Sequence, residues 1–142
     1  MAGAAIVAIL RMVLVPVGSF REGLASLSWG MPADSVRAVL GEPNRICASS
    51  SVDHVPLSGP DTAAVRSALR TATAERWIYT RREGRRPIPR DADPACRAPS
   101  IATELGFDAS LRLRWYVREM DQTALEFDPA LIAPSLPGRS AR

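Results

Sequence analysis

The side chains with the greatest potential for chemistry lie in one serine-rich stretch. His54 is the only histidine of the 142-residue chain, Asp53 precedes it, and Cys47 and Ser50 lie a few residues upstream. A cysteine or serine activated by a histidine is the arrangement of a nucleophilic enzyme. Such a site needs a rigid support that orients its groups, and this stretch shows no helix or strand pattern. We therefore expect no enzyme, and catalysis by the His54 loop is the weakest of three hypotheses.

Motifs for cofactors and metals are absent from the sequence. There is no GxGxxG, no GxxxxGK[ST] and no HExxH motif, and these are the short patterns that bind dinucleotides, phosphates and catalytic zinc. The two cysteines, Cys47 and Cys96, lie outside any CxxC spacing. The sequence therefore predicts no cofactor and no metal.

The same two cysteines allow two interpretations. A disulfide between Cys47 and Cys96 would close a loop of roughly 50 residues and stabilise the fold by about 3 to 4 kcal/mol. The alternative is two unrelated thiols, buried or free. The sequence leaves both open.

Positive charge is concentrated in one segment. All 18 basic residues are arginines, the net charge is +3, and seven arginines fall within residues 75–97 against four acids. These arginines could contact phosphates, and Trp77 and Tyr79 beside them could stack on nucleic-acid bases. The alternation of the strand, however, points both rings to the core. We expect a solvated loop, whose acidic-partner surface would consist of Arg81, Arg82, Arg85, Arg86 and Arg90.

The N-terminal residues resemble an export segment in composition. Residues 2–17 are apolar except for Arg11, whereas a signal peptide places its basic residues before the apolar run and a membrane helix needs about 20 apolar residues. Residues 1–22 are therefore predicted to be a signal-like or anchor segment, and membrane association would occur through residues 2–20. The alternative is a buried segment of a cytoplasmic domain.

The remaining chain has the pattern of one small α+β domain, and its 46% apolar content is enough for a single core. The stretch GMPADSVRAVLGEP predicts a two-turn helix, because Pro32 suits a first turn and Gly41 and Pro43 end it. Residues 44–60 are predicted to be loop. A second helix is expected from Asp61, whose side chain would cap it.

After this helix the apolar period changes to that of strands. In RWIYTR, Trp77 and Tyr79 share the predicted core face, and Arg76 and Ile78 share the other. Residues 81–99 are predicted to be a long excursion. A hairpin follows. In its second strand, the alternation predicts one face that carries Leu111, Leu113, Trp115 and Val117. A short strand in residues 123–128 would be the fourth, and residues 131–142 are predicted to be a flexible tail.

A set of residues recurs along these elements in a fixed order: Gly30, Met31, Val36, Leu40, Gly41, Pro43, Arg76, Trp77, Tyr79, Leu105, Phe107, Asp108 and Leu113. With this pattern the chain resembles the SmpA/OmlA family of small, BamE-like outer-membrane assembly lipoproteins. The resemblance implies a fold like that of the β-lactamase inhibitory protein, with short N-terminal helices on one face of a three-stranded antiparallel sheet. Residues 23–130 would form this domain, with residues 44–74 as an inserted loop and helix. No cysteine precedes Cys47, so a lipid anchor is not expected.

The first hypothesis is thus a non-enzymatic domain in the periplasm or cell envelope that binds another envelope protein. By resemblance, its role would be in outer-membrane protein assembly or envelope integrity. The second is a cytoplasmic or membrane-tethered module whose Arg-rich loop, residues 81–90, engages an acidic partner or nucleic acid.

Overall fold

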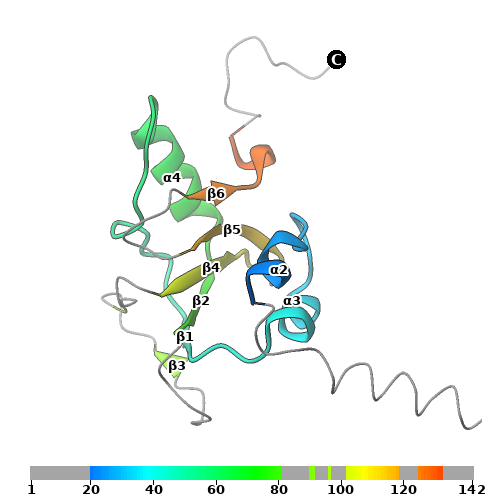
Figure 1. The fold of residues 1–142 in the computed structure, drawn as a ribbon. Helices are drawn as coiled ribbons and strands as arrows, with labels where there is room; N and C mark the ends of the chain where they lie inside the picture. The colour runs from blue at the N-terminus through cyan, green and yellow to red at the C-terminus, as the bar shows by residue number, and fades with distance from the viewer. Residues whose placement is uncertain (1–19, 81–89, 92–95, 97–101, 119–124, 133–142) are drawn as a thin grey trace, which may run out of the picture.

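The computed structural model describes residues 20–80, 90–91, 96, 102–118 and 125–132. In these residues three α-helices and one short 3-10 helix accompany six strands (Figure 1). The helices are α2 (Phe20–Ala25), α3 (Ala33–Leu40), α4 (Thr62–Ala72) and η2 (Pro129–Leu131). The strands are β1 (Arg45–Cys47), β2 (Glu75–Tyr79), β3 (Arg90–Asp91), β4 (Thr103–Phe107), β5 (Leu113–Val117) and β6 (Glu126–Phe127).

The strands form one sheet in the order β3-β1-β2-β4-β5-β6. All neighbours are antiparallel except β3, which runs parallel to β1. The predicted α+β class is confirmed, but the sheet is wider than the three or four strands expected. The additional strands β1 and β3 fall in stretches predicted to be loop, because two or three residues are too few to show an alternating pattern.

Helix α3 ends where its sequence predicts, and it begins one residue after Pro32, which was predicted to lie in its first turn. Pro32 occupies the N-cap position, and Gly41, at φ 83°, donates its N–H to the Arg37 carbonyl oxygen. Left-handed backbone of this kind favours glycine, which carries no Cβ. The segment before the helix also pairs with β5, since Gly30 N donates to Leu113 O and Leu113 N to Met31 O, each at 2.9 Å.

Helix α4 forms as expected, but its predicted cap does not. Asp61 lies at the N-cap position with a left-handed φ of 62°, and its side chain makes no capping hydrogen bond. A capping side chain needs an extended backbone to reach the first free N–H groups. The capping role assigned to Asp61 is therefore wrong.

Helices cover both faces of the sheet. We call the face that carries Trp77, Tyr79, Leu105 and Phe107 the first face; these side chains form one cluster with buried residues of α2 and α3. Helix α4 and the loop of residues 48–57 cover the opposite, second face (Figure 1). The resemblance implied short N-terminal helices on one face and gave no position for the helix of the inserted segment, which lies on the opposite face.

The second face is buried as completely as the first. Arg76 and Ile78 were predicted to lie on the face of a half-buried strand that points away from the core, yet Arg76 is fully buried and Ile78 is 2% exposed. Strands covered on both sides have few exposed positions, and polar residues inside them must then find partners within the protein.

A bulge breaks the alternation predicted for β5. The register shifts so that Phe107 pairs with Leu113 while Gly106 pairs with Trp115. Leu113 therefore packs in the first-face cluster, whereas Trp115 and Val117 pack in the cluster under α4. Leu111, predicted to lie on the same face, is instead exposed at the hairpin tip. One extra residue in a strand reverses the faces of the side chains beyond it.

The predicted domain boundaries differ from the element boundaries. Helix α2 runs across the predicted division between residues 22 and 23, and its Phe20 packs against the first-face cluster. Leu131, at the start of the predicted tail, packs against the second-face cluster. Residues 1–19 and 133–142 lie outside the described part. Within the described part, no helix has the length and apolar character needed to cross a bilayer.

Candidate functional site

The polar centre of the molecule lies on the second face, where β2 and β4 run side by side. Ile78 is paired with Glu104 and Arg76 with Gly106, so Arg76 and Glu104 are diagonal neighbours on one face. Both side chains are fully buried, and Arg76 Nη1 donates to Glu104 Oε1. A buried ion pair of this kind is tolerated only where further hydrogen bonds satisfy the remaining polar atoms.

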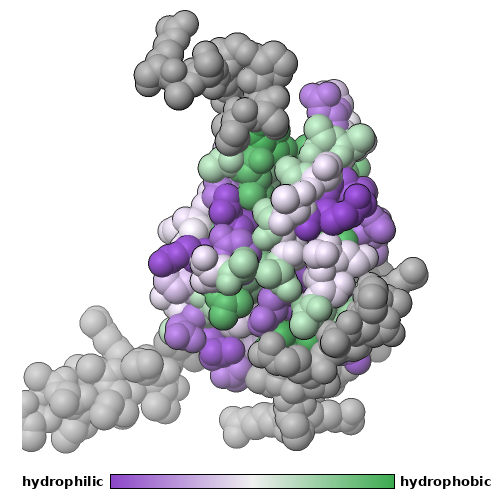
Figure 2. All heavy atoms as spheres, turned by 180° about the vertical axis from the view of Figure 1, so that it is seen from behind, coloured by the Kyte–Doolittle hydropathy of each residue, from purple (hydrophilic) through white to green (hydrophobic). Residues whose placement is uncertain are grey.

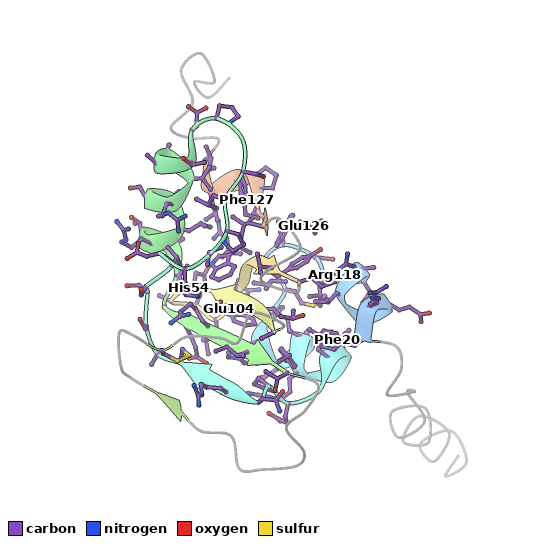
Figure 3. The ribbon with its side chains drawn as sticks, turned by 60° about the vertical axis from the view of Figure 1, so that its left-hand side comes forward. Phe20, His54, Glu104, Arg118, Glu126 and Phe127 are labelled. Carbon is purple, nitrogen blue, oxygen red and sulfur yellow. A yellow bond between two sulfur atoms is a disulfide. The ribbon has the colours of Figure 1, made fainter. Side chains whose placement is uncertain are left out.

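His54 completes this cluster from the inserted loop. Its Nε2 atom lies 2.8 Å from Glu104 Oε2, and its side chain is 18% exposed. Arg76 Nη1 also lies near this nitrogen, at 3.1 Å, but the contact to Glu104 is the shorter one, so we assign the proton of His54 to Nε2 and direct it to the carboxylate. Figure 3 shows His54 and Glu104 together on the α4 side of the sheet, away from Phe20 on α2.

Two backbone carbonyls accept further hydrogen bonds from Arg76. Arg76 Nε donates to Ser49 O at 3.2 Å and Nη2 donates to Cys96 O at 2.8 Å. Cys96 is bonded to Cys47, which ends β1. The guanidinium thus contacts both chain segments that the disulfide joins.

Arginines of α4 fix the loop above the cluster. Arg66 donates to the carbonyl oxygens of Val52 and Val55, and Arg70 Nη2 lies 2.7 Å from Asp53 Oδ1. The hydrogen bond and the charge of Arg70 hold the pKa of Asp53 below its usual value. The loop is therefore tied to the helix on one side and to the sheet on the other.

This geometry bears on the chemistry that the sequence suggested for the His54 loop. Cys47 is 0% exposed and its sulfur is bonded, so it provides no thiolate nucleophile. The partner of His54 is Glu104, 50 residues away, rather than its neighbour Asp53. In the described part of the chain, no group of three or more His, Cys, Asp or Glu side chains is arranged to hold a metal ion.

Residues of the family-like pattern lie mainly in the first-face core and at its borders. Val36 and Phe107 are fully buried, and the Trp77 and Phe107 rings lie 4.5 Å apart between centroids. Met31 and Leu40 pack against the same cluster, and Pro43 is buried.

Two of these residues also fix the backbone, and Tyr79 does so from within the first-face cluster. Tyr79 Oη donates to Gly41 O at 2.9 Å, and Asp108 Oδ1 accepts hydrogen bonds from the backbone N–H groups of Ser110 and Arg112. The presence of tyrosine and aspartate at these two positions is thus explained by packing or by turn geometry.

The Arg-rich surface lies mostly outside the described residues. This applies to Arg81, Arg82, Arg85 and Arg86. Only the backbone of Arg90 is described; it lies in β3 and pairs with Ile46 of β1. The acidic-partner surface thus stays a prediction.

Sequence reasoning missed Glu104 and Gly106. A Cβ on Gly106 would lie 1.9 Å from Trp115 Nε1, so the Trp115 indole can lie against the β4 backbone only because position 106 is glycine. A signal was present: the positions that alternate with the predicted core residues include Ile78 in β2, Ala102 just before β4 and Gly106 in β4, which is unusual for a solvated face.

Comparisons with known proteins give no relative. Neither a protein-family model nor a curated protein matches the sequence, and no solved structure matches the fold. The class defined by the structure is an α+β domain whose sheet is covered on both faces and carries one disulfide.

Proposed function

We propose that this chain is an exported, non-enzymatic domain of the cell envelope that binds another protein. The observation that carries the proposal is the disulfide between Cys47 and Cys96. Disulfides persist in the periplasm and other oxidising compartments and are rare in the cytosol. The apolar composition of residues 2–17 supports the same location.

The resemblance to SmpA/OmlA proteins supports the envelope role independently. Its residues gather around one core and its borders, with Trp77, Phe107 and Val36 in contact within a single cluster. By that resemblance the partner would be an outer-membrane assembly component. Helix α4 and its loop have no counterpart in the family pattern, so the contact surface must be argued from this chain alone.

The β4–β5 hairpin tip is the surface best suited to a protein contact. Leu111 is 43% exposed and is the only large hydrophobic residue so exposed in the described part of the chain. Its φ of 55° is left-handed, a conformation that disfavours side chains with a Cβ by about 1 to 2 kcal/mol. Strain at an exposed apolar residue is typical of a binding position.

The tip is rigid as well as exposed. Leu111 N donates to Asp108 O and Leu111 O accepts from Ala33 N, each at 2.9 Å. Arg112 Nη1 donates to Gly30 O at 3.0 Å, which ties the tip to the segment before α3. A preorganised apolar contact loses little entropy when a partner binds.

Aromatic residues lie on the segment and strand beside this tip. The rings of Trp29 and Tyr116 lie 5.7 Å apart between centroids, and both side chains are half-buried. Together with Arg112 they supply the residue types that dominate protein interfaces. On the face seen in Figure 2, by contrast, apolar residues occur in small groups between hydrophilic ones.

Thiol trapping in native cells tests the location. We expect Cys47 and Cys96 to resist alkylation until the extracted protein is unfolded and reduced, and to react fully afterwards. Unfolding the protein before the first alkylation step distinguishes the two cases. A buried thiol then reacts, whereas a cysteine in a disulfide does not. Alkylation of unfolded protein without reductant would contradict the envelope proposal and favour the cytoplasmic alternative.

Photo-cross-linking in cells tests the surface. A photoreactive residue at position 111 should form an adduct with an envelope protein, and one at the exposed Ser67 on α4 should not. With the photoreactive residue moved to the neighbouring exposed Ser110, Leu111→Gly should weaken the adduct while leaving stability unchanged or raising it by up to about 1 kcal/mol, because glycine relieves the left-handed strain. Equal adducts from both positions would refute the hairpin surface, and adducts with nucleic acid would favour the Arg-rich loop of residues 81–90.

A further inference from the structure

The disulfide and the buried ion pair are linked through one side chain. Arg76 donates to Ser49 O, two residues beyond Cys47, and to Cys96 O itself. Its Nη1 atom donates to the carboxylate of Glu104 and lies 3.1 Å from His54 Nε2. The guanidinium can remain away from water only while both carbonyls stay in place, because an unsatisfied buried charge is strongly unfavourable.

The loop of residues 48–57 depends on the same link. It follows Cys47 directly, and its Val52 and Val55 pack against Trp115 and Val117 of the second face. Its polar contacts to the sheet are made through Arg76 and through His54 with Glu104. If the segments around the cysteines separate, the loop loses its attachment on one side.

The first face has no such dependence. Its cluster consists of apolar side chains from α2, α3 and the sheet. Cys47 and Cys96 instead form a separate small cluster with Ile78 and Ala102 on the second side. Loss of the bond should therefore affect the two faces differently.

We propose that the Cys47–Cys96 disulfide is a redox-controlled lock on the second face alone. A dithiol reductant, small or protein-borne, would supply two electrons and two protons; the S–S bond breaks, two thiols form, and the reductant closes its own disulfide. Reduction then frees the loop of residues 48–57, water reaches Arg76 and Glu104, and the second face opens while the first face stays packed. This inference concerns the purified chain and does not rest on the envelope location.

The structure also predicts how fast the lock responds. Cys47 is 0% and Cys96 is 4% exposed, and thiol exchange requires access to a sulfur. A transient opening of the second face must therefore precede reduction, and loss of the bond then makes the open state persist. His54→Ala, which removes the loop contact to Glu104, should accelerate reduction by at least about tenfold, whereas Arg37→Ala, at a half-buried arginine on the first-face side, should not.

Two indole N–H groups report separately on the two faces. Trp115 Nε1 donates to Thr73 Oγ1 on the second face, and Trp77 Nε1 donates to Glu75 Oε1 on the first, both at 2.8 Å. Hydrogen exchange of these protons can be followed by NMR in the full chain, with and without excess dithiothreitol. On reduction we expect exchange at Trp115 to rise by at least about tenfold and exchange at Trp77 to change by less than about twofold.

A variant without thiols separates the lock from side effects of the reductant. Cys47→Ala combined with Cys96→Ala should reproduce the reduced pattern in the absence of dithiothreitol. Two results would overturn the proposal. Unchanged protection of both indoles would mean that the bond locks nothing, and equal loss at both would mean that it stabilises the whole domain rather than one face.

Discussion

The two faces of the sheet are closed by different interactions. Apolar side chains of α2 and α3 cover the first face, and its cluster contains no charged residue. The second face encloses Arg76, Glu104 and His54 beside a disulfide. Apolar packing tolerates small changes in geometry, whereas a buried ion pair depends on every partner. The difference indicates that the first face supplies the scaffold and that the second face holds the inserted loop and α4 in place.

The largest effect on the first face is expected from Trp77→Ala. Trp77 is 1% exposed, packs against Phe107 and lies 4.8 Å below the Arg37 guanidinium. We expect a loss of about 3 to 5 kcal/mol in the free energy of unfolding, measured by urea titration. Trp77→Phe, which keeps an aromatic ring, should lose clearly less. A neutral Trp77→Ala variant would show that this face is not the scaffold.

A loss of similar size is expected on the second face from Glu104→Ala. Its removal leaves Arg76 buried without a counter-charge, which costs about 3 to 5 kcal/mol. The double variant Arg76→Met with Glu104→Leu should recover part of this loss, because it removes both charges together.

This rescue distinguishes the two faces. At the second face the second substitution repairs the first, whereas at the first face Trp77→Ala with Phe107→Ala should only add to the damage. A double variant at the second face that is no more stable than Glu104→Ala would show that the Arg76 contacts to Ser49 and Cys96 outweigh the charge effect.

A smaller effect is expected from Gly106→Ala, which tests the bulge between the faces. The added methyl would overlap the Trp115 indole, whose Nε1 lies 1.9 Å from the ideal Cβ position. Overpacking of this kind costs about 1 to 3 kcal/mol. Trp115→Phe in the Gly106→Ala background should relieve the overlap. If Gly106→Ala is as stable as the parent in the same urea titration, the indole does not lie against the β4 backbone as described.

The first face could be predicted from the sequence because its signals are local. Pro32 and Gly41 mark the ends of α3, and the alternation of Trp77 and Tyr79 identifies the inward side of β2. The helix of residues 62–72 was also visible in its apolar stripe. Each of these signals needs only neighbouring residues.

The second face could not be predicted because its contacts join distant residues. His54 meets Glu104 across 50 positions, and Arg76 meets Glu104 across 28. The alternation of β5 was extended through Trp115 without the bulge, which only the pairing with β4 reveals. The position of α4 could not be predicted for the same reason. A strand pattern shows which side chains share a face, but it does not show which element covers that face.

High pH should destabilise the first face before the second, and this is the smallest of the expected effects. Tyr79 and Tyr116 are the only tyrosines, and both pack with the first-face cluster. Burial raises the pKa of Tyr79 above its usual value, and burial with the hydrogen bond to Glu126 raises the pKa of Tyr116 to about 12. In the unfolded chain both phenols have a pKa of about 10. Because the folded-state values are higher, the contribution of these groups to stability is complete below about pH 10 and is lost as the pH rises through the folded-state values.

The ultraviolet absorbance of tyrosinate in the folded chain measures this directly. We expect little ionisation at pH 10, then ionisation of Tyr116 near pH 12, with Tyr116→Phe removing that step and leaving Tyr79 as the only phenol. Over the same range the indole proton of Trp77 should lose protection before that of Trp115 does, because both phenols lie on the first-face side. Ionisation of both tyrosines near pH 10 in the folded chain would contradict the burial on which the first face depends.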